Sequence, residues 1–241
     1  MLFDRIKNSK MFRPLLADIR KQNGIRLEIL KAQRFNSTIV DSEWLKYKNF
    51  SPGDWAAGYG LLYTIYCTLN SVKPQSLIEF GLGQSSKMVH QYANYFKADA
   101  VTIEHDSQWV DFFNAGRDGK YDVRVRLSDL EEIEYKGQKT VTYKDMDAIL
   151  EGKTYDFVLV DGPFGSDHYS RPEVLDVVKG HLAPSFCIIM DDTERREEEE
   201  TAREVMAELS ARKIDFCSNV YKSLKYHTLI CSPDWKFLTS L

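Results

Sequence analysis

Long hydrophobic runs and cysteine are both scarce in this 241-residue chain. No apolar run approaches the about 18 residues that a membrane-spanning helix needs, and the opening segment Met1–Lys7 shows no signal-peptide core. The four cysteines, at positions 67, 187, 217 and 231, lack the spacing of a zinc site or a disulfide framework. We therefore expect reduced, mostly buried thiols in a cytoplasmic protein without a transmembrane segment.

Charge is unevenly divided along the chain. Residues 1–50 carry 11 Lys and Arg against 5 Asp and Glu, whereas the remainder carries 21 against 31. The acidic remainder and a pI near 5.8 argue against nucleic acid as the main partner. We expect a helical extension over residues 1–50 that packs on the domain or on a second subunit, forming a homo-oligomer, and one α/β domain over residues 51–241.

Helical periodicity opens the chain. Apolar residues at helical spacing predict two helices within residues 1–35, broken at Asn23-Gly24. A further helix is predicted from Trp55 to Leu69, with Ser51 or Asp54 as its cap. The acidic run Glu197–Glu200 is interpreted as the solvated first turns of a later helix.

Short apolar runs then alternate with amphipathic stretches, which is typical of a parallel sheet with crossover helices. The last two runs are separated by only a few residues and predict a terminal hairpin. The fold class is therefore α/β: a doubly wound, mostly parallel seven-stranded, Rossmann-like sheet with a C-terminal antiparallel hairpin, preceded by N-terminal helices. The predicted strands are Ser76–Phe80, Ala100–Glu104, Asp122–Leu127, Tyr155–Val160, Phe186–Met190, Asp215–Val220 and Tyr226–Cys231.

The turn after the first strand is the first functional signal. An acid, Glu79, precedes two glycines, Gly81 and Gly83, and a helix is predicted from Ser85. Such a turn lets backbone N–H groups and a helix N-terminus approach a ligand. The dinucleotide fingerprint requires a third glycine where this chain has Ser86. A junction without any ligand stays open as an alternative.

Acidic residues end nearly every predicted parallel strand. In open α/β sheets, ligands bind beyond the carboxyl ends of the strands. Glu104 stands 21 residues after Gly83, where a carboxylate can accept the ribose hydroxyls of a nucleoside, and His105 and Asp106 are the neighbouring alternatives. Ser128-Asp129 lies where an adenine could be contacted, or it caps a helix.

The remaining signals lie at the ends of two buried strands. Tyr155–Gly165 reads Tyr-Asp-Phe-Val-Leu-Val-Asp-Gly-Pro-Phe-Gly, and Phe186–Asp192 ends in Asp191-Asp192. With the acid-and-glycine turn, these motifs resemble class I S-adenosylmethionine (SAM)-dependent methyltransferases, and the catechol-type O-methyltransferases in particular, over roughly residues 50–231. The resemblance implies SAM contacts at Glu79, Gly81, Gly83, Ser85, Glu104, His105, Ser128, Asp129 and Asp161. It also implies Mg²⁺ or another divalent cation on Asp161, Asp191 and Asp192.

The match to the catechol enzymes is incomplete, because Phe164 stands where those enzymes place a lysine base. The Val-Asp-Gly-Pro-Phe-Gly turn and the Asp-Asp-Thr-Glu-Arg ending at Arg195 are more similar to the glucuronoxylan 4-O-methyltransferase family. That resemblance implies a sugar hydroxyl as methyl acceptor. The candidate catalytic residues are Asp161, Asp191 and the loop histidine His168, although a loop histidine can also be simply solvated.

The sequence thus predicts a SAM-dependent O-methyltransferase acting on a hydroxyl of a saccharide or small polyol, with divalent metal assistance as a separate expectation. The expected partner is a small-molecule or glycan acceptor. One alternative is a nicotinamide-dependent oxidoreductase, against which the missing third glycine and the lack of a Tyr-x-x-x-Lys pair in a suitable helix count. The other is a non-catalytic binding protein with the methyltransferase fold.

Overall fold

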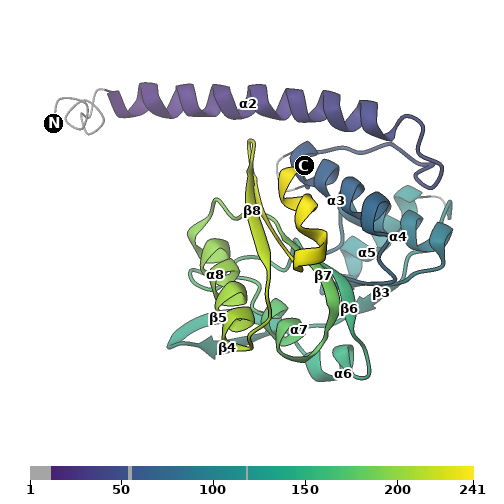
Figure 1. Ribbon diagram of the computed structural model, residues 1–241, viewed down its shortest axis with the longest axis vertical. Helices are drawn as coiled ribbons and strands as arrows, with labels where there is room; N and C mark the ends of the chain where they lie inside the picture. Colours follow the sequence, from purple (N-terminus) through teal and green to yellow (C-terminus); the bar gives the residue numbers. More distant parts are fainter. Residues whose placement is uncertain (1–11, 54–55, 118) are drawn as a thin grey trace.

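The computed structural model describes residues 12–53, 56–117 and 119–241. Its centre is a seven-stranded sheet in the order β3-β2-β1-β6-β7-β9-β8 (Figure 1). The first five of these strands run parallel, β9 pairs antiparallel with β7, and β8 pairs antiparallel with β9. This topology confirms the predicted fold class. The strands of this sheet are β1 (Ser76–Phe80), β2 (Asp99–Glu104), β3 (Val125–Leu127), β6 (Tyr155–Val160), β7 (Leu182–Met190), β8 (Cys217–Lys222) and β9 (Tyr226–Cys231).

Helices cover both faces of the sheet, because successive strand residues point to opposite sides. On β6, Phe157 and Leu159 join one buried cluster while Val158 and Val160 join the other. The first cluster is completed by helices α2, α3 and α4, and the second by α6, α7 and α8. The helices are α2 (Phe12–Ile39), α3 (Tyr59–Val72), α4 (Gln84–Phe96), α5 (Ser107–Arg117), α6 (Met146–Leu150), α7 (Val174–Gly180), α8 (Arg196–Ala211) and the 3₁₀ segment η1 (Pro233–Ser240).

Three predicted strands match the structure at both ends, and the others differ at their termini. The third shortens to β3, the fifth lengthens to β7, and the sixth shifts to β8. The helix predicted from Trp55 begins at Tyr59, and both Trp55 and Asp54 lie outside the described residues. Asp145 precedes α6, and its side chain makes no capping hydrogen bond.

A small hairpin that the sequence analysis did not predict follows β3. Strand β4 (Leu130–Tyr135) pairs antiparallel with β5 (Gln138–Tyr143) in a separate two-stranded sheet. The turn residues Lys136 and Gly137 both have positive φ, the conformation that two-residue hairpin turns need. This hairpin also shows that Ser128-Asp129 does not cap a helix, because β4 begins directly after it.

From residue 12 onward the N-terminal part is a single helix, where the sequence predicts a break at Asn23-Gly24, and residues 1–11 lie outside the described residues. Helix α2 runs unbroken through Asn23-Gly24 and lies across one end of the domain, over the tip of the β8–β9 hairpin (Figure 1). At the crossing, Gly24 is buried against Leu224, and the predicted breaker continues the helix. Farther along, Glu28 accepts a hydrogen bond from the Tyr59 backbone N–H, which ties α2 to the start of α3.

No helix among the described residues is both long enough and apolar enough to cross a membrane.

We predict that Gly24→Ala raises the free energy of unfolding by about 0.5–1 kcal/mol, because alanine restricts the unfolded chain and favours the helix. The added methyl group would lie 3.4 Å from Leu224 Cδ1, an ordinary contact. Urea denaturation measures the change. The matched control is Ala17→Gly at an exposed position of the same helix, which should lower stability by a similar amount. A loss of stability in Gly24→Ala would contradict the prediction.

Candidate functional site

The glycine turn after β1 lies directly against the end of β6. Gly81 has φ +92°, and a Cβ there would lie 2.7 Å from the Asp161 carbonyl oxygen. The approach is mutual, because a Cβ on Gly162 would lie 2.7 Å from the Gly81 Cα. Two loops that are far apart in sequence therefore touch backbone to backbone, and only glycine permits this contact.

Gly83 is a glycine for a different reason. Its φ of −166° is extended, and a Cβ built on it would meet no atom within 4 Å. It precedes the first turn of α4, where its own N–H donates to Ser86 Oγ at 2.9 Å. Open space at a helix N-terminus is the arrangement that accepts a negatively charged ligand group.

Glu79 and Ser85 lie beneath this turn rather than on its surface. Both are fully buried, and Ser85 Oγ donates to Glu79 Oε1 at 2.6 Å. Thr102 Oγ1 donates to the other carboxylate oxygen at 2.6 Å, and His90 Nε2 lies 2.8 Å from the same hydroxyl. Burial raises the pKa of Glu79 to about 7, against the effect of these hydrogen bonds. These buried hydrogen bonds around Glu79 stabilise the glycine turn.

Glu104 stands at the end of β2 and faces the glycine turn, as the sequence predicts. Its Oε2 accepts the backbone N–H of Leu82 at 2.9 Å, and its Oε1 accepts those of His105 and Asp106 at 2.7 and 3.0 Å. The carboxylate is thus fixed in place, and Oε2 keeps capacity for a ligand hydroxyl. Asp106 itself caps α5, because its Oδ1 accepts the N–H groups of Gln108 and Trp109.

The sequence analysis assigned no binding role to two exposed aromatic side chains near Glu104. Trp109 Nε1 donates to the Leu82 carbonyl at 2.7 Å, so the indole lies beside the glycine turn. Phe164 is 71% exposed, and its ring meets the His105 ring edge-on at 5.5 Å between centroids. Exposed aromatic rings beside a nucleoside-type carboxylate offer a surface for a base. The signal for Phe164 was its place directly after the Asp-Gly-Pro turn.

Ser128 and Asp129 lie at the start of the β4–β5 hairpin. The Ser128 backbone N–H donates to the Glu104 carbonyl at 2.9 Å, and its hydroxyl donates to the Lys144 carbonyl at 2.7 Å. The Asp129 side chain is largely exposed and lies 3.6 Å from Lys144 Nζ. The pair therefore borders the end of β2, and its contact with an adenine stays a prediction.

Asp161, Asp191 and Asp192 form one acidic cluster at the ends of β6 and β7. One carboxylate oxygen from each lies within 4.8 Å of the others. Burial raises the pKa of Asp161 to about 6 and, together with the neighbouring carboxylates, raises that of Asp191 well above its usual range. Burial also acts on Asp192, but nearby cations outweigh it and lower its pKa.

Three cationic side chains surround this cluster. Arg171 Nη2 donates to Asp192 Oδ2 at 3.0 Å, and Arg195 Nη1 lies 3.3 Å from the same oxygen. Lys225 Nζ lies 3.3 Å from Asp192 Oδ1, so both oxygens of this carboxylate face a cation. Arg171 is 5% exposed, and its Nη1 lies 4.0 Å from Asp161 Oδ1. The sequence analysis missed this arrangement, because the three cations come from different loops.

The donor set fits a divalent cation poorly, although carboxylate oxygens are its usual ligands. Both Asp192 oxygens already face positive groups, and an ion placed among the three carboxylates would be close to Arg171, Arg195 and Lys225. Two unit charges 4 Å apart repel by about 4 kcal/mol at an effective dielectric of 20. Repulsion from the three cations would therefore offset much of the attraction that the three carboxylates exert on a doubly charged ion, and no step proposed for this site is routed through a metal.

His168 is not brought to the acidic cluster. Its Nδ1 lies 3.0 Å from Glu200 Oε2, and Arg196 Nη2 approaches its Nε2 at 3.4 Å, so it joins the loop over residues 165–171 to α8. A catalytic role for His168 stays a prediction.

The same loop is also held by the β4–β5 hairpin. Ser166 Oγ accepts the Val141 N–H at 3.1 Å, and Thr140 Oγ1 donates to the Tyr169 carbonyl at 3.0 Å. The Tyr135 ring meets the Tyr169 ring edge-on.

The acidic run of α8 is not uniformly solvated, which corrects the sequence interpretation. Glu198 is buried, and neither carboxylate oxygen has a hydrogen-bond partner among the described residues. Burial raises its pKa to about 7, although Arg171 acts in the opposite direction. Glu173, before α7, is equally buried, and burial raises its pKa to about 8.

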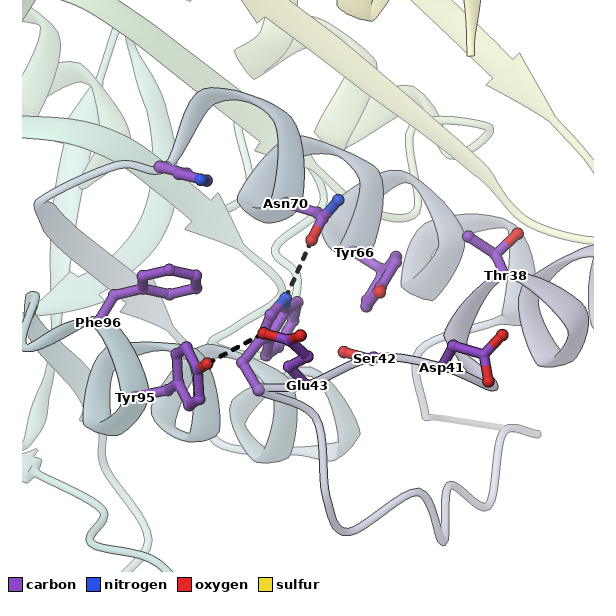
Figure 2. A pocket seen from close by; sticks show the side chains of 10 residues that line it. Thr38, Asp41, Ser42, Glu43, Tyr66, Asn70, Tyr95 and Phe96 are labelled. Carbon is purple, nitrogen blue, oxygen red and sulfur yellow. Dashed lines mark hydrogen bonds between the residues drawn. The ribbon is translucent and has the colours of Figure 1, made fainter.

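A pocket of about 480 Å³ lies away from this edge of the sheet. It is lined by residues near the C-terminal ends of α2, α3 and α4, and the last two of these helices lead into the N-terminal ends of β1 and β2. Figure 2 shows Tyr95 OH directed at Glu43. The Trp44 indole Nε1 donates to Asn70 Oδ1 at 3.2 Å. Both bonds tie the α2–α3 connection to the helices.

No family model matches the sequence, and no curated protein matches it significantly. Solved structures do match. The O-methyltransferase TomG from Streptomyces achromogenes, in complex with SAM, aligns with a TM-score of 0.54 at 12% identity, over 86% of this chain and 97% of that one. A protein from Klebsiella pneumoniae, named as a candidate O-methyltransferase, aligns with a TM-score of 0.52 at 14% identity and the same coverage. The chain therefore has the Rossmann-like fold of SAM-dependent methyltransferases.

We predict that alanine lowers stability at Gly81 and weakens ligand binding at Gly83. Gly81→Ala should lower the free energy of unfolding by about 2 kcal/mol or more, because its methyl group would overlap the Asp161 carbonyl. Gly83→Ala should change stability by less than about 0.5 kcal/mol, yet weaken binding of S-adenosylhomocysteine about tenfold or more by filling the open space. Urea denaturation and calorimetry measure the two effects. Equal stability losses in both variants would contradict the assignment.

Glu79 predicts a pH dependence of stability. With its pKa raised to about 7, the folded chain holds a proton that the unfolded chain releases near pH 4.5. This group therefore makes stability fall as pH rises between about 4.5 and 7. Glu79→Gln should reduce the stability difference between pH 5 and pH 8, measured by urea denaturation. The exposed Glu151→Gln serves as control and should leave that difference unchanged.

Proposed function

We propose that this protein is a SAM-dependent O-methyltransferase that transfers a methyl group to a hydroxyl of a saccharide or small polyol. One observation carries the proposal: the glycine turn, Glu104 and Asp161 share one edge of the sheet. The Leu82 N–H bonds Glu104, and Gly81 packs against the Asp161 backbone. A nucleoside-type carboxylate and an acidic cluster thus border the same ligand-accepting turn.

The residues present suit SAM, which, when bound, supplies an electrophilic methyl group on a sulfonium. Gly83 and the N-terminus of α4 offer open space and N–H groups for the methionine carboxylate. Glu104 Oε2 can accept a ribose hydroxyl. The exposed ring of Phe164 and the half-buried ring of His105 offer a border for the adenine.

The acidic cluster would handle the acceptor proton. In an in-line displacement, the acceptor oxygen forms its bond to the methyl carbon as the carbon–sulfur bond breaks, and the hydroxyl proton passes to a carboxylate. Asp161 suits this role, because it stands beside the glycine turn and remains partly accessible. Asp192 is held by three cations and would orient its neighbours. Asp191 Oδ2 has no partner among the described residues and is the second candidate acceptor of the proton.

The acceptor class is the finer part of the proposal. It is supported by the similarity of the Asp161–Gly165 turn and the Asp191–Arg195 segment to glycan O-methyltransferases. It is also supported by a border rich in carboxylates, which accept hydrogen bonds from sugar hydroxyls. Metal assistance is left out of this mechanism because the cluster already faces cations of the chain. The homo-oligomer through the N-terminal helix stays a prediction.

We expect the purified protein to bind S-adenosylhomocysteine with a micromolar dissociation constant and to show no comparable binding of NAD. Glu104→Gln should weaken that binding about tenfold, which corresponds to about 1.4 kcal/mol, without loss of folding. Isothermal titration calorimetry measures both, and Glu131→Gln, exposed on β4, is the control. Wild-type protein that binds NAD but not S-adenosylhomocysteine would favour the oxidoreductase alternative. Turnover is then sought across a panel of saccharide and polyol acceptors, and cofactor binding without turnover would favour a non-catalytic role.

A further inference from the structure

A buried guanidinium joins the two strand ends that carry the acidic cluster. Arg171 donates from Nε to the Pro163 carbonyl at 3.3 Å, just beyond β6. From Nη1 it donates to the Asp191 carbonyl at 3.2 Å, and from Nη2 to the Asp192 carboxylate, just beyond β7. All three nitrogens are therefore engaged, and the positive charge lies between the ends of the strands.

The backbone around this contact is unusual on both sides. Arg171 and Asp192 each have φ +61°, a left-handed conformation that residues with a Cβ rarely adopt. Such conformations persist where the surroundings fix them, and they gather at functional sites. The two partners of one buried ion pair share this conformation.

Two further cations complete the arrangement from other directions. Arg195 comes from the start of α8, and Lys225 comes from the turn of the β8–β9 hairpin, where it also donates to the Ala56 carbonyl. Segments spread over the second half of the chain thus bring positive charge to one carboxylate. Asp191 and Asp192 are buried, so their charge must be compensated, and the chain's own cations supply that compensation at both oxygens of Asp192.

We propose that Arg171, assisted by Arg195 and Lys225, occupies the place of a divalent cation at Asp161, Asp191 and Asp192, so that the protein binds no metal there. Arg171 is then a positioning residue, which holds the ends of β6 and β7 in register and leaves Asp161 directed at the acceptor. This inference rests on the proposed function for its catalytic meaning. The test of this inference does not depend on the proposed function, because metal binding is measured without any turnover.

The first experiment titrates the wild-type protein with Mn²⁺ and follows the free-ion signal by electron paramagnetic resonance. We expect the six-line signal of aqueous Mn²⁺ to remain undiminished at protein concentrations well above those of the ion. Stoichiometric loss of that signal, abolished by Asp192→Asn, would overturn the proposal.

The second experiment removes the charges one at a time in Arg171→Met and Lys225→Met. Each variant should gain Mn²⁺ binding that the wild type lacks, whereas Arg171→Lys should still exclude the ion. Lys222→Met, an exposed cation of β8, is the matched control and should behave as the wild type does. Circular dichroism checks folding, and Lys225→Met keeps the test open if Arg171→Met does not fold. No Mn²⁺ binding by any folded variant would refute the claim that these cations exclude the metal.

Calorimetry with S-adenosylhomocysteine separates the two levels of inference. Wild-type binding that is unchanged by EDTA, together with Mn²⁺ exclusion, supports both the proposed function and the metal-free cluster. Absence of cofactor binding would refute the proposed function, while the Mn²⁺ result would still decide the fate of the cluster.

Discussion

The contact between Gly81 and Gly162 is the constraint on which the site depends. Parallel strands place their carboxyl ends at one edge of a sheet, but the sheet alone leaves their loops several ångströms apart. Removing both side chains lets the loop after β1 and the loop after β6 touch through their backbones. Glu104 then closes the third side by accepting the Leu82 N–H. Glu104 and the acidic cluster are therefore brought together by backbone geometry rather than by side-chain packing.

The buried acids of the site differ in pKa because different charged and polar groups surround them. No cation among the described residues acts on Glu79, and hydrogen bonds from Ser85, Thr102 and Ser86 oppose the effect of burial on its pKa. Asp192 is buried as well, yet cations on both of its oxygens hold it ionised. Asp161 lies between these cases, with a pKa of about 6. One edge of the sheet thus holds a carboxyl group that stabilises the glycine turn, Glu79, one that cations hold in place, Asp192, and one whose pKa suits proton transfer, Asp161.

Much of the fold could be read from the sequence, because the buried strands are short apolar runs and their ends are acidic. The same rule located Glu104, Asp161, Asp191 and Asp192 at one edge. Helix α2 was misjudged because glycine disfavours a helix, whereas here Gly24 is buried at the crossing with the hairpin tip and the helix continues through it. The β4–β5 hairpin was missed although its Lys136-Gly137 turn and alternating polarity were present. The cations around Asp192 could not be placed, because nothing local in the sequence links Arg171 or Lys225 to that residue.

The β4–β5 hairpin has a consequence for how an acceptor enters. Its strands grip the loop over residues 165–171 through Ser166 and Tyr169, and Tyr135 reaches across to Glu204 on α8. That loop also carries Arg171, so moving it would break the ion pairs at the bottom of the site. The loop beside the acidic cluster is thus held from two sides, and under the proposed function we expect acceptors to be selected by their fit to a fixed surface rather than by closure of a mobile loop.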